Sequence, residues 1–178
     1  MAKTLNALLA GFGGQGILFA GKVMAYAGLI ENKEISWLPS YGPEMRGGTA
    51  NCSVVISDES IGSPLVVNPD VLIAMNLPSL DKFENEVVPG GTIIVDSSII
   101  SKKVDRTDVK AYYVEATKLA EDNGLKGLAN IILVGKMLKE LGFVSPEAID
   151  KAIDKCVPPK KADKVALNKQ AIKIGTEN

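Results

Sequence analysis

The chain has 178 residues, a length typical of one folded domain, which can bury roughly 70% of the surface exposed by the unfolded chain. A hydrophobic share of 46% and a charged share of 23% are those of an ordinary globular protein and exclude the disordered, collagen-like and disulfide-dense classes. The formal net charge of −1 provides no overall field that would attract nucleic acid or an anionic membrane. We therefore expect one domain over residues 1–178, with neither nucleic acid nor a membrane as a partner.

The N-terminal segment lacks an export pattern. It carries one lysine before Asn6, and glycines break the apolar run that follows, unlike a signal peptide or a spanning helix. The chain has two cysteines, Cys52 and Cys156, and no histidine, so we expect neither a zinc site nor a four-thiolate iron–sulfur cluster within it. We predict a cytoplasmic protein in which Cys52 is a small hydrophobe of a strand.

The first third of the chain predicts strands around one helix. Residues 6–10 form a short apolar run that ends in glycines, and residues 15–30 carry apolar side chains at helical spacing. Residues 34–38 are predicted as a second strand. Residues 50–56 are predicted as a third, because apolar side chains recur there at every second position.

The rest of the chain predicts buried strands and then mostly helices. The continuous apolar runs at 71–75 and 92–95 are typical of strands buried on both faces of a parallel sheet. Ser145 followed by Pro146 is a strong helix start, and Gly142 is a good stop for the helix before it. The remaining predictions are a short helix over 78–87, a strand over 112–114, and helices over 115–121, 128–141, 146–156 and 161–173.

This alternation of strands and helices predicts an α/β fold. We expect a three-layer, Rossmann-like, doubly wound and mostly parallel sheet with right-handed crossovers and helices on both faces. The helical C-terminal region is expected to pack on that sheet or on a partner.

The first candidate site is a glycine loop. The residues Gly11, Gly13, Gly14, Gln15 and Gly16 belong to a G-x-G-x-x-G pattern placed directly after a predicted strand and at the opening of a predicted helix. Glycines let backbone N–H groups approach an anion, and the helix start adds roughly half a positive charge. The pattern indicates a phosphate-binding turn. The alternative is that the glycines only let the helix pack closely on the strand.

An ordinary dinucleotide site also needs an acidic residue at the end of the second strand. That strand runs instead into Trp37, Leu38 and Pro39. Glu31 and Glu34 lie before or at the strand's start, which is the wrong end for a ligand at the carboxyl edge of the sheet. The sequence therefore disfavours NAD binding of the usual kind.

The second candidate site is the glycine- and proline-broken loop between the second and third strands. It contains Tyr41, Glu44, Met45 and Arg46, a mixture suited to gripping a ligand or another protein. Arg46 could clamp a phosphate or carboxylate with two hydrogen bonds. The alternative is a surface turn with an internal salt bridge between Glu44 and Arg46.

Three smaller candidates follow along the chain. Asp96 ends a predicted strand at the carboxyl edge of the sheet, where it is a ligand contact or, more simply, a cap of the following turn. Asn130, within an apolar helix start, is predicted as a satisfied structural group. The lysines at 160, 161 and 164 are expected to form a solvated face, with contact to coenzyme A phosphates as the alternative.

The glycine loop and the stretch W-L-P-S-Y-G-P-E-M-R-G-G-T-A-N-C-S over residues 37–53 together make a resemblance specific. They resemble the gamma subunit of the 2-oxoacid:ferredoxin oxidoreductases, a family that includes the pyruvate and ketoisovalerate enzymes, and I-G-S-P at 61–64 fits the same pattern. The resemblance covers the whole length. In this form it is most similar to the gamma subunits of the 2-oxoglutarate and branched-chain 2-oxoacid enzymes.

This resemblance implies a part in a larger enzyme. Such a complex decarboxylates a 2-oxoacid on thiamine diphosphate with magnesium, forms an acyl-coenzyme A, and passes electrons through iron–sulfur clusters to ferredoxin. Alpha and beta subunits, with or without a delta (ferredoxin-like) subunit, would hold those groups, so we expect no cofactor bound by this chain alone and no catalytic residue in it. The resemblance assigns coenzyme A or phosphate binding to the glycine loop and subunit contact to Tyr41, Glu44 and Arg46.

Two other functions remain open from the sequence. One is a self-sufficient NAD(P)-dependent dehydrogenase, which the glycine loop favours and which the lack of an acidic ribose contact and of any histidine disfavours. The other is a binding module for a nucleotide, coenzyme A or an acyl carrier, with no enzyme around it.

Overall fold

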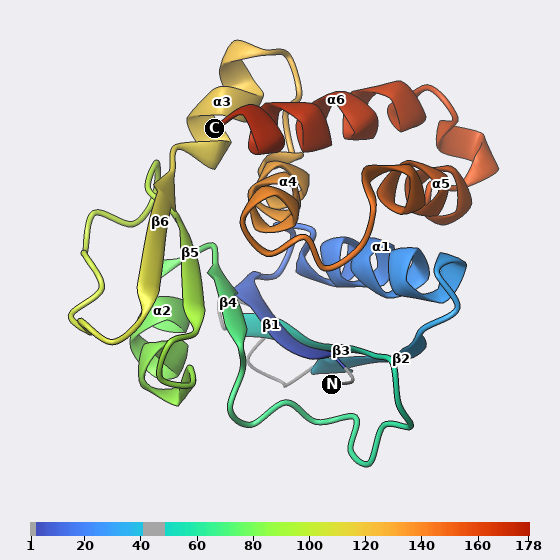
Figure 1. Cartoon of the computed structure of the whole chain (residues 1–178). Helices are drawn as coiled ribbons and strands as arrows, with labels where there is room; N and C mark the ends of the chain where they lie inside the picture. Colours follow the sequence, from blue (N-terminus) through green and yellow to red (C-terminus); the bar gives the residue numbers. More distant parts are fainter. Residues whose placement is uncertain (1–2, 41–48) are drawn as a thin grey trace.

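The computed structural model describes residues 3–40 and 49–178. They form one mixed sheet with helices on both faces (Figure 1). The strands are β1 (Thr4–Phe12), β2 (Glu34–Ser40), β3 (Thr49–Ser57), β4 (Val71–Ala74), β5 (Thr92–Asp96) and β6 (Lys110–Val114). The helices are α1 (Ile17–Ile30), α2 (Leu77–Phe83), α3 (Ala116–Asp122), α4 (Ala129–Leu141), α5 (Pro146–Cys156) and α6 (Lys164–Glu177), with short 3₁₀ turns at Glu84–Glu86 and Pro159–Lys161.

The sheet has the strand order β2-β3-β1-β4-β5-β6. The run from β1 through β4 and β5 to β6 is parallel, whereas β3 is antiparallel to both of its neighbours, β1 and β2. The predicted sheet of mostly one direction is confirmed, with β3 as the reversed strand. The reversal has a simple cause, because residues 41–48 are too few for the crossover of a dozen or more residues that a parallel pair requires.

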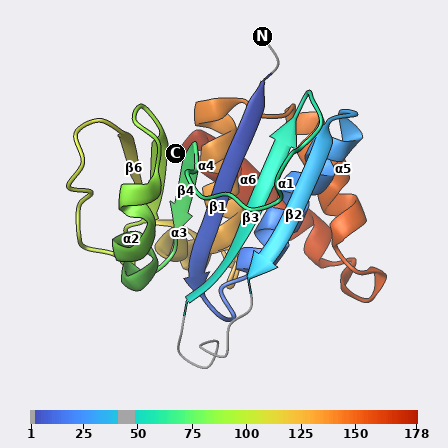
Figure 2. The same ribbon diagram turned by 90° about the horizontal axis from the view of Figure 1, so that it is seen from below.

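The two faces of the sheet carry separate hydrophobic clusters, because successive side chains of a strand point to opposite faces. Leu9 and Ile73 belong to the larger cluster, which α1 and α4 cover, and Leu8 and Leu72 belong to the smaller one, which α2 covers. Val66 is also buried, and its N–H donates a hydrogen bond to Ser53 Oγ at 3.2 Å, on the face of the sheet that carries the smaller cluster. Figure 2 shows the segment between β3 and β4 crossing this face of β3 and β1.

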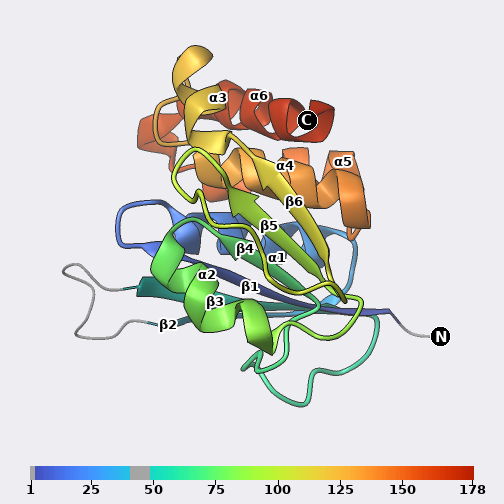
Figure 3. The same ribbon diagram turned by 90° about the vertical axis from the view of Figure 1, so that its left-hand side faces the viewer.

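The C-terminal helices form an additional layer instead of packing on the sheet. α5 packs on α1 and α6 packs on α4, on the side away from the strands (Figure 3). At the α4–α6 crossing, Gly135 and Gly175 face each other so closely that a Cβ on either would collide with backbone of the other helix. The helix start at Ser145 is confirmed, since its side chain accepts from the N–H of Ala148. Among the described residues no helix is both long and apolar enough to cross a membrane.

Candidate functional site

A tight turn of glycines joins β1 to α1. Gly14 and Gly16 have φ values of 92° and 74°, in the left-handed region that residues with a Cβ rarely adopt. Gly16 is the N-cap of α1 and has no side chain that could accept a hydrogen bond from the helix. The N–H groups in the first turn of α1 therefore lack a capping side chain. The predicted turn between strand and helix is confirmed, and its geometry suits an anion.

Gln15 braces this turn from inside. Its Oε1 accepts a hydrogen bond from the N–H of Phe12 at 2.6 Å, and its Nε2 donates to the carbonyl oxygen of Met75 at 3.0 Å. A Cβ on Gly11 would lie 2.6 Å from Gln15 Oε1, so the glycine leaves room for the brace. Both ends of the amide are used within the chain. Gln15 therefore holds the backbone of the loop in place.

Asn130 supports the same turn from α4. Its Nδ2 donates to the carbonyl oxygen of Gly16 at 2.8 Å, and a Cβ on Gly16 would lie 2.5 Å from that nitrogen. The side chain is 3% exposed, and its Oδ1 has no hydrogen-bond partner among the described residues. The prediction of a structural group is confirmed for the donor end of this amide. Two of the loop's glycines thus also leave room for neighbouring side chains, Gln15 at Gly11 and Asn130 at Gly16, whereas the alternative stated from the sequence was close packing of the helix on the strand.

Two hollows flank the glycine loop. One, of about 260 Å³, lies over the start of α1 and is lined by Phe12, Phe19 and Ala50 with the glycines. No charged side chain of the described residues lines it, and the helix dipole at the start of α1 favours an anion there. The other, of about 290 Å³, lies against Gly14 and Gln15 and includes Glu121 and Lys126. No sequence pattern pointed to these two residues, because they are single polar positions more than a hundred residues from the loop.

The sheet order removes the usual ribose site of a dinucleotide-binding fold. In a dinucleotide-binding fold the second strand lies next to the first. In this chain β3 lies between β1 and β2, so the end of β2 is two strands away from the glycine loop. Glu31 accepts a hydrogen bond from the N–H of Ser145 at 2.6 Å, where it supports the start of α5. Glu34 pairs in the sheet with Ser57, at the edge opposite the loop. Neither carboxylate is placed to bind a ribose held at the glycine loop.

The predicted contact loop, with Tyr41, Glu44 and Arg46, lies outside the described residues. The strands on either side of it can be placed. Ser40 pairs with Asn51, and Phe12 pairs with Thr49. The end of β2, the start of β3 and the glycine loop after β1 therefore lie at the same end of the strands. The two sequence candidates are therefore attached to the same edge.

Asp96 is a cap and not a ligand contact. It is fully buried, its Oδ1 accepts from the N–H groups of Ser98 and Thr117, and its Oδ2 accepts from Thr117 Oγ1 at 2.6 Å. These bonds tie the end of β5 to the start of α3. The capping alternative, stated from the sequence, is the one the structure supports.

The two cysteines are buried in different parts of the fold. Cys52 is 0% exposed behind α1, as predicted for a small hydrophobe of a strand, and burial raises the pKa of its thiol to about 12. Burial also raises the pKa of Cys156, at the end of α5, to about 11. Over residues 3–40 and 49–178, no three cysteine, aspartate or glutamate side chains gather as a metal site would require. The described residues do not fit an iron–sulfur cluster.

Comparison with known proteins identifies relatives over the whole chain. A family model described as pyruvate ferredoxin/flavodoxin oxidoreductase matches residues 6–178. The 2-oxoglutarate synthase subunit KorC of Methanocaldococcus jannaschii is 40% identical over 153 residues, which make up 84% of this chain and 82% of that protein. The ketoisovalerate oxidoreductase subunit VorA of Methanothermobacter thermautotrophicus is 47% identical over 130 residues, which make up 73% of this chain and 27% of VorA. The chain thus spans about a quarter of the length of the VorA proteins that it matches.

Solved structures agree with these relatives. The gamma subunit of a keto/oxoacid ferredoxin oxidoreductase from Geobacter sulfurreducens superposes with a TM-score of 0.84 at 31% identity, covering 97% of this chain and 96% of that one. A 2-oxoglutarate:ferredoxin oxidoreductase from Magnetococcus marinus has the same fold within a longer chain, with a TM-score of 0.86 at 21% identity over 98% of this chain and 31% of that one.

Proposed function

The chain belongs to the pyruvate ferredoxin/flavodoxin oxidoreductase family, and on that premise we propose that it is the gamma subunit of a thiamine diphosphate-dependent 2-oxoacid:ferredoxin oxidoreductase. The observation that carries the proposal is the match to more than four fifths of KorC and to nearly the whole of a solved gamma subunit, each of which is a separate chain of about this length. The complex would convert a 2-oxoacid to an acyl-coenzyme A and reduce ferredoxin. Its substrate would be 2-oxoglutarate first, and otherwise a branched-chain 2-oxoacid or pyruvate, in line with the names of the relatives.

Within that complex the glycine loop would receive a phosphate of coenzyme A. The hollow over the start of α1 supports this role, because the glycines and the first residues of α1 line it and a helix N-terminus favours an anion. Gly11, Gly13, Gly14 and Gly16 would shape the turn, and Gln15 would hold it through its bonds to Phe12 and Met75. The segment with Tyr41, Glu44 and Arg46 would contact a neighbouring subunit beside this loop.

The other cofactors would belong to partner subunits. Thiamine diphosphate, which supplies the carbanion chemistry of decarboxylation, and its magnesium would lie with the alpha and beta chains, and the iron–sulfur clusters with a ferredoxin-like delta chain or domain. The two buried cysteines on separate elements support this division. The chain would act in the cytoplasm, by assembling the complex and presenting the coenzyme-facing loop.

Native purification tests the proposal. The untagged protein is purified from its source, its companions are identified by mass spectrometry, and the fraction is assayed for reduction of a viologen dye with a panel of 2-oxoacids and coenzyme A. We expect thiamine-binding and ferredoxin-like chains to elute with the protein, and activity to require them. A chain that elutes alone and binds NADH in a one-to-one ratio would refute the subunit assignment and favour the dehydrogenase. A chain that elutes alone and binds only coenzyme A would favour a binding module.

A further inference from the structure

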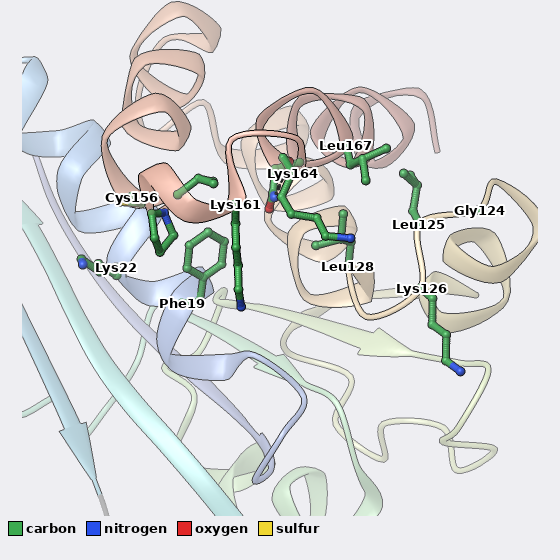
Figure 4. A pocket seen from close by; sticks show the side chains of 13 residues that line it. Phe19, Lys22, Gly124, Leu125, Lys126, Leu128, Cys156, Lys161, Lys164 and Leu167 are labelled. Atoms are coloured by element: carbon green, nitrogen blue, oxygen red, sulfur yellow. Dashed lines mark hydrogen bonds between the residues drawn. The ribbon is translucent and has the colours of Figure 1, made fainter.

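A larger cavity adjoins the two hollows of the glycine loop, sharing Phe19 with one and Lys126 with the other, and no glycine of the loop lines it. It has a volume of about 560 Å³, within the range of roughly 300 to 1,000 Å³ typical of small-molecule sites. Its walls come from α1, the connection between α3 and α4, the end of α5 and the start of α6 (Figure 4). Four segments distant in the sequence therefore meet around one space.

The lining is apolar and basic. Phe19, Leu125, Leu128 and Leu167 are among the apolar residues that line the cavity. Among the described residues, the charged ones of the lining are the lysines at 22, 126, 161 and 164, and no acidic residue is among them. None of these four lysines forms an ion pair within the described part of the chain. The cavity therefore joins an apolar interior to unpaired positive charge.

The lysines are arranged around the apolar part. In Figure 4, Lys161 and Lys164 extend between Phe19 and Leu128, while Lys22 and Lys126 lie at the two ends of the view. Lysine ammonium groups bind carboxylates and phosphates by charge and hydrogen bonds, and a buried apolar surface favours a hydrocarbon body. This combination fits an amphiphilic anion.

Asn168 is a polar residue of the same lining. It is 3% exposed, and its Nδ2 donates to the carbonyl oxygen of Lys164 at 2.8 Å. Its Oδ1 has no partner among the described residues, but this atom is closed off from solvent and so does not face a ligand in the cavity. The lysines therefore supply the polar contacts of the cavity.

From these observations we propose that this cavity is a second ligand site, which binds a small amphiphilic anion: a hydrocarbon chain that carries a carboxylate or phosphate. The chain packs against Phe19, Leu128 and Leu167, and the anionic group pairs with Lys161 and Lys164. No residue of the glycine loop lines the site, which adjoins the two hollows beside that loop, and the proposal does not depend on the function proposed for the loop.

Calorimetric titration of the full chain and of the purified complex tests this site. The probes are N-octanoylglycine, which has a tail, an amide and a carboxylate; N-methyloctanamide, which lacks the charge; and (octanoylamino)methylphosphonate, which keeps the tail and the amide and exchanges the carboxylate for a phosphonate. We expect one N-octanoylglycine per chain, bound at least tenfold more tightly than the neutral amide. The tighter of the two anions indicates whether the cavity prefers a carboxylate or a phosphate-type group.

Charge-matched variants locate the binding. The double variant Lys161→Gln/Lys164→Gln should weaken N-octanoylglycine about tenfold or more, since a hydrogen bond to a charged group contributes about 1.5 to 3 kcal/mol. The control Lys155→Gln/Lys160→Gln removes two exposed lysines of the same region that do not line the cavity, and it should bind like the unaltered chain.

Five results would overturn the proposal. Four of them are no binding of either anion, equal binding of the neutral amide, equal weakening in the control variant, and binding to the free chain that is lost in the complex. The last result would mean that a partner subunit occupies the cavity. Competition by coenzyme A would merge the cavity with the coenzyme site and so refute its independence, whereas failure of coenzyme A to bind at the glycine loop leaves this test unaffected.

Discussion

Placing a negative charge on the glycine loop tests whether that loop receives an anion. Gly14 is exposed, and a Cβ built on it meets no atom within 4 Å, so a side chain there fits sterically. Its φ of 92° strains any residue other than glycine. Gly14→Asp and Gly14→Asn share this strain and nearly the same shape, and they differ by one charge. Their difference therefore isolates the electrostatic effect.

Coulomb's law gives the size of that effect. A carboxylate about 6 Å from a bound phosphate, in an effective dielectric of about 40, is repelled by about 1.4 kcal/mol, which is roughly a tenfold loss of affinity. We expect the KM for coenzyme A of the purified complex to be about ten times higher for Gly14→Asp than for Gly14→Asn. The KM for the 2-oxoacid should be the same for both. Added salt should narrow the difference, because the charges are exposed to solvent.

Viologen reduction at varied coenzyme A provides the assay, with subunit ratios of both complexes checked by gel densitometry. Equal KM values for the two variants, at equal subunit ratios, would show that no anion binds near Gly14. The glycines would then serve only the packing of Gly11 around Gln15 and of Gly16 against Asn130. A rise in the KM of the 2-oxoacid instead would place a different anionic substrate at the loop.

Three further predictions concern stability. Gly175→Ala places a methyl group against the backbone of α4, so we expect the free energy of unfolding in urea to fall by about 1 to 3 kcal/mol. The control Lys173→Ala changes an exposed residue of the same helix and should lower it by less than about 0.5 kcal/mol. Equal losses in the two variants would contradict the close crossing of α4 and α6. Asp96→Asn weakens charge-assisted bonds to Thr117 and should lower stability by about 1 to 3 kcal/mol without changing the KM for coenzyme A, whereas a changed KM would restore Asp96 as a ligand contact. Burial raises the pKa of Cys52 from 9.0 to about 12, so above pH 9 the thiol ionises in the unfolded chain before it ionises in the folded one. The free energy of unfolding therefore keeps the full contribution of Cys52 below pH 9 and falls by about 1.4 kcal/mol per pH unit from there toward pH 12. Urea unfolding from pH 8 to 11 should show a shallower slope for Cys52→Ala, and parallel slopes would refute the assignment.

Local pattern was sufficient for most elements. The helix predicted at 146–156 has those bounds as α5, because Ser145 and Pro146 form a capping signal that depends on neighbours in the sequence. The apolar run predicted as a strand at 92–95 is part of β5. A continuous apolar run indicates a strand buried on both faces even when its neighbouring strands are unknown. Boundaries were less accurate where no such signal exists: the helix predicted at 78–87 ends at Phe83 and continues as a 3₁₀ turn, and the one predicted at 161–173 spans Lys164–Glu177.

The glycine loop was also predictable, but the purpose of its individual residues was not. The pattern indicated a turn at Gly11–Gly16 because left-handed backbone is largely restricted to glycine. The hydrogen bonds from Gln15 to Met75 and from Asn130 to Gly16 became evident only in the tertiary structure, because the partners are 60 and 114 residues apart in the sequence. Asp96 illustrates the same limit: a carboxylate at the end of a strand suits a ligand or a cap, and only the position of Thr117 decides between them.

What the sequence by itself determined was the α/β class, the glycine turn and the family, because each depends on residues close together in the chain. What only the tertiary structure decided was the reversed β3 between β1 and β2, the outer layer of α5 and α6, and the basic cavity at Asn168. The physical reason is that hydrogen bonding, helix capping and left-handed turns act over a few residues. Strand order and cavities depend instead on which distant apolar faces bury each other, and many pairings satisfy that requirement almost equally well.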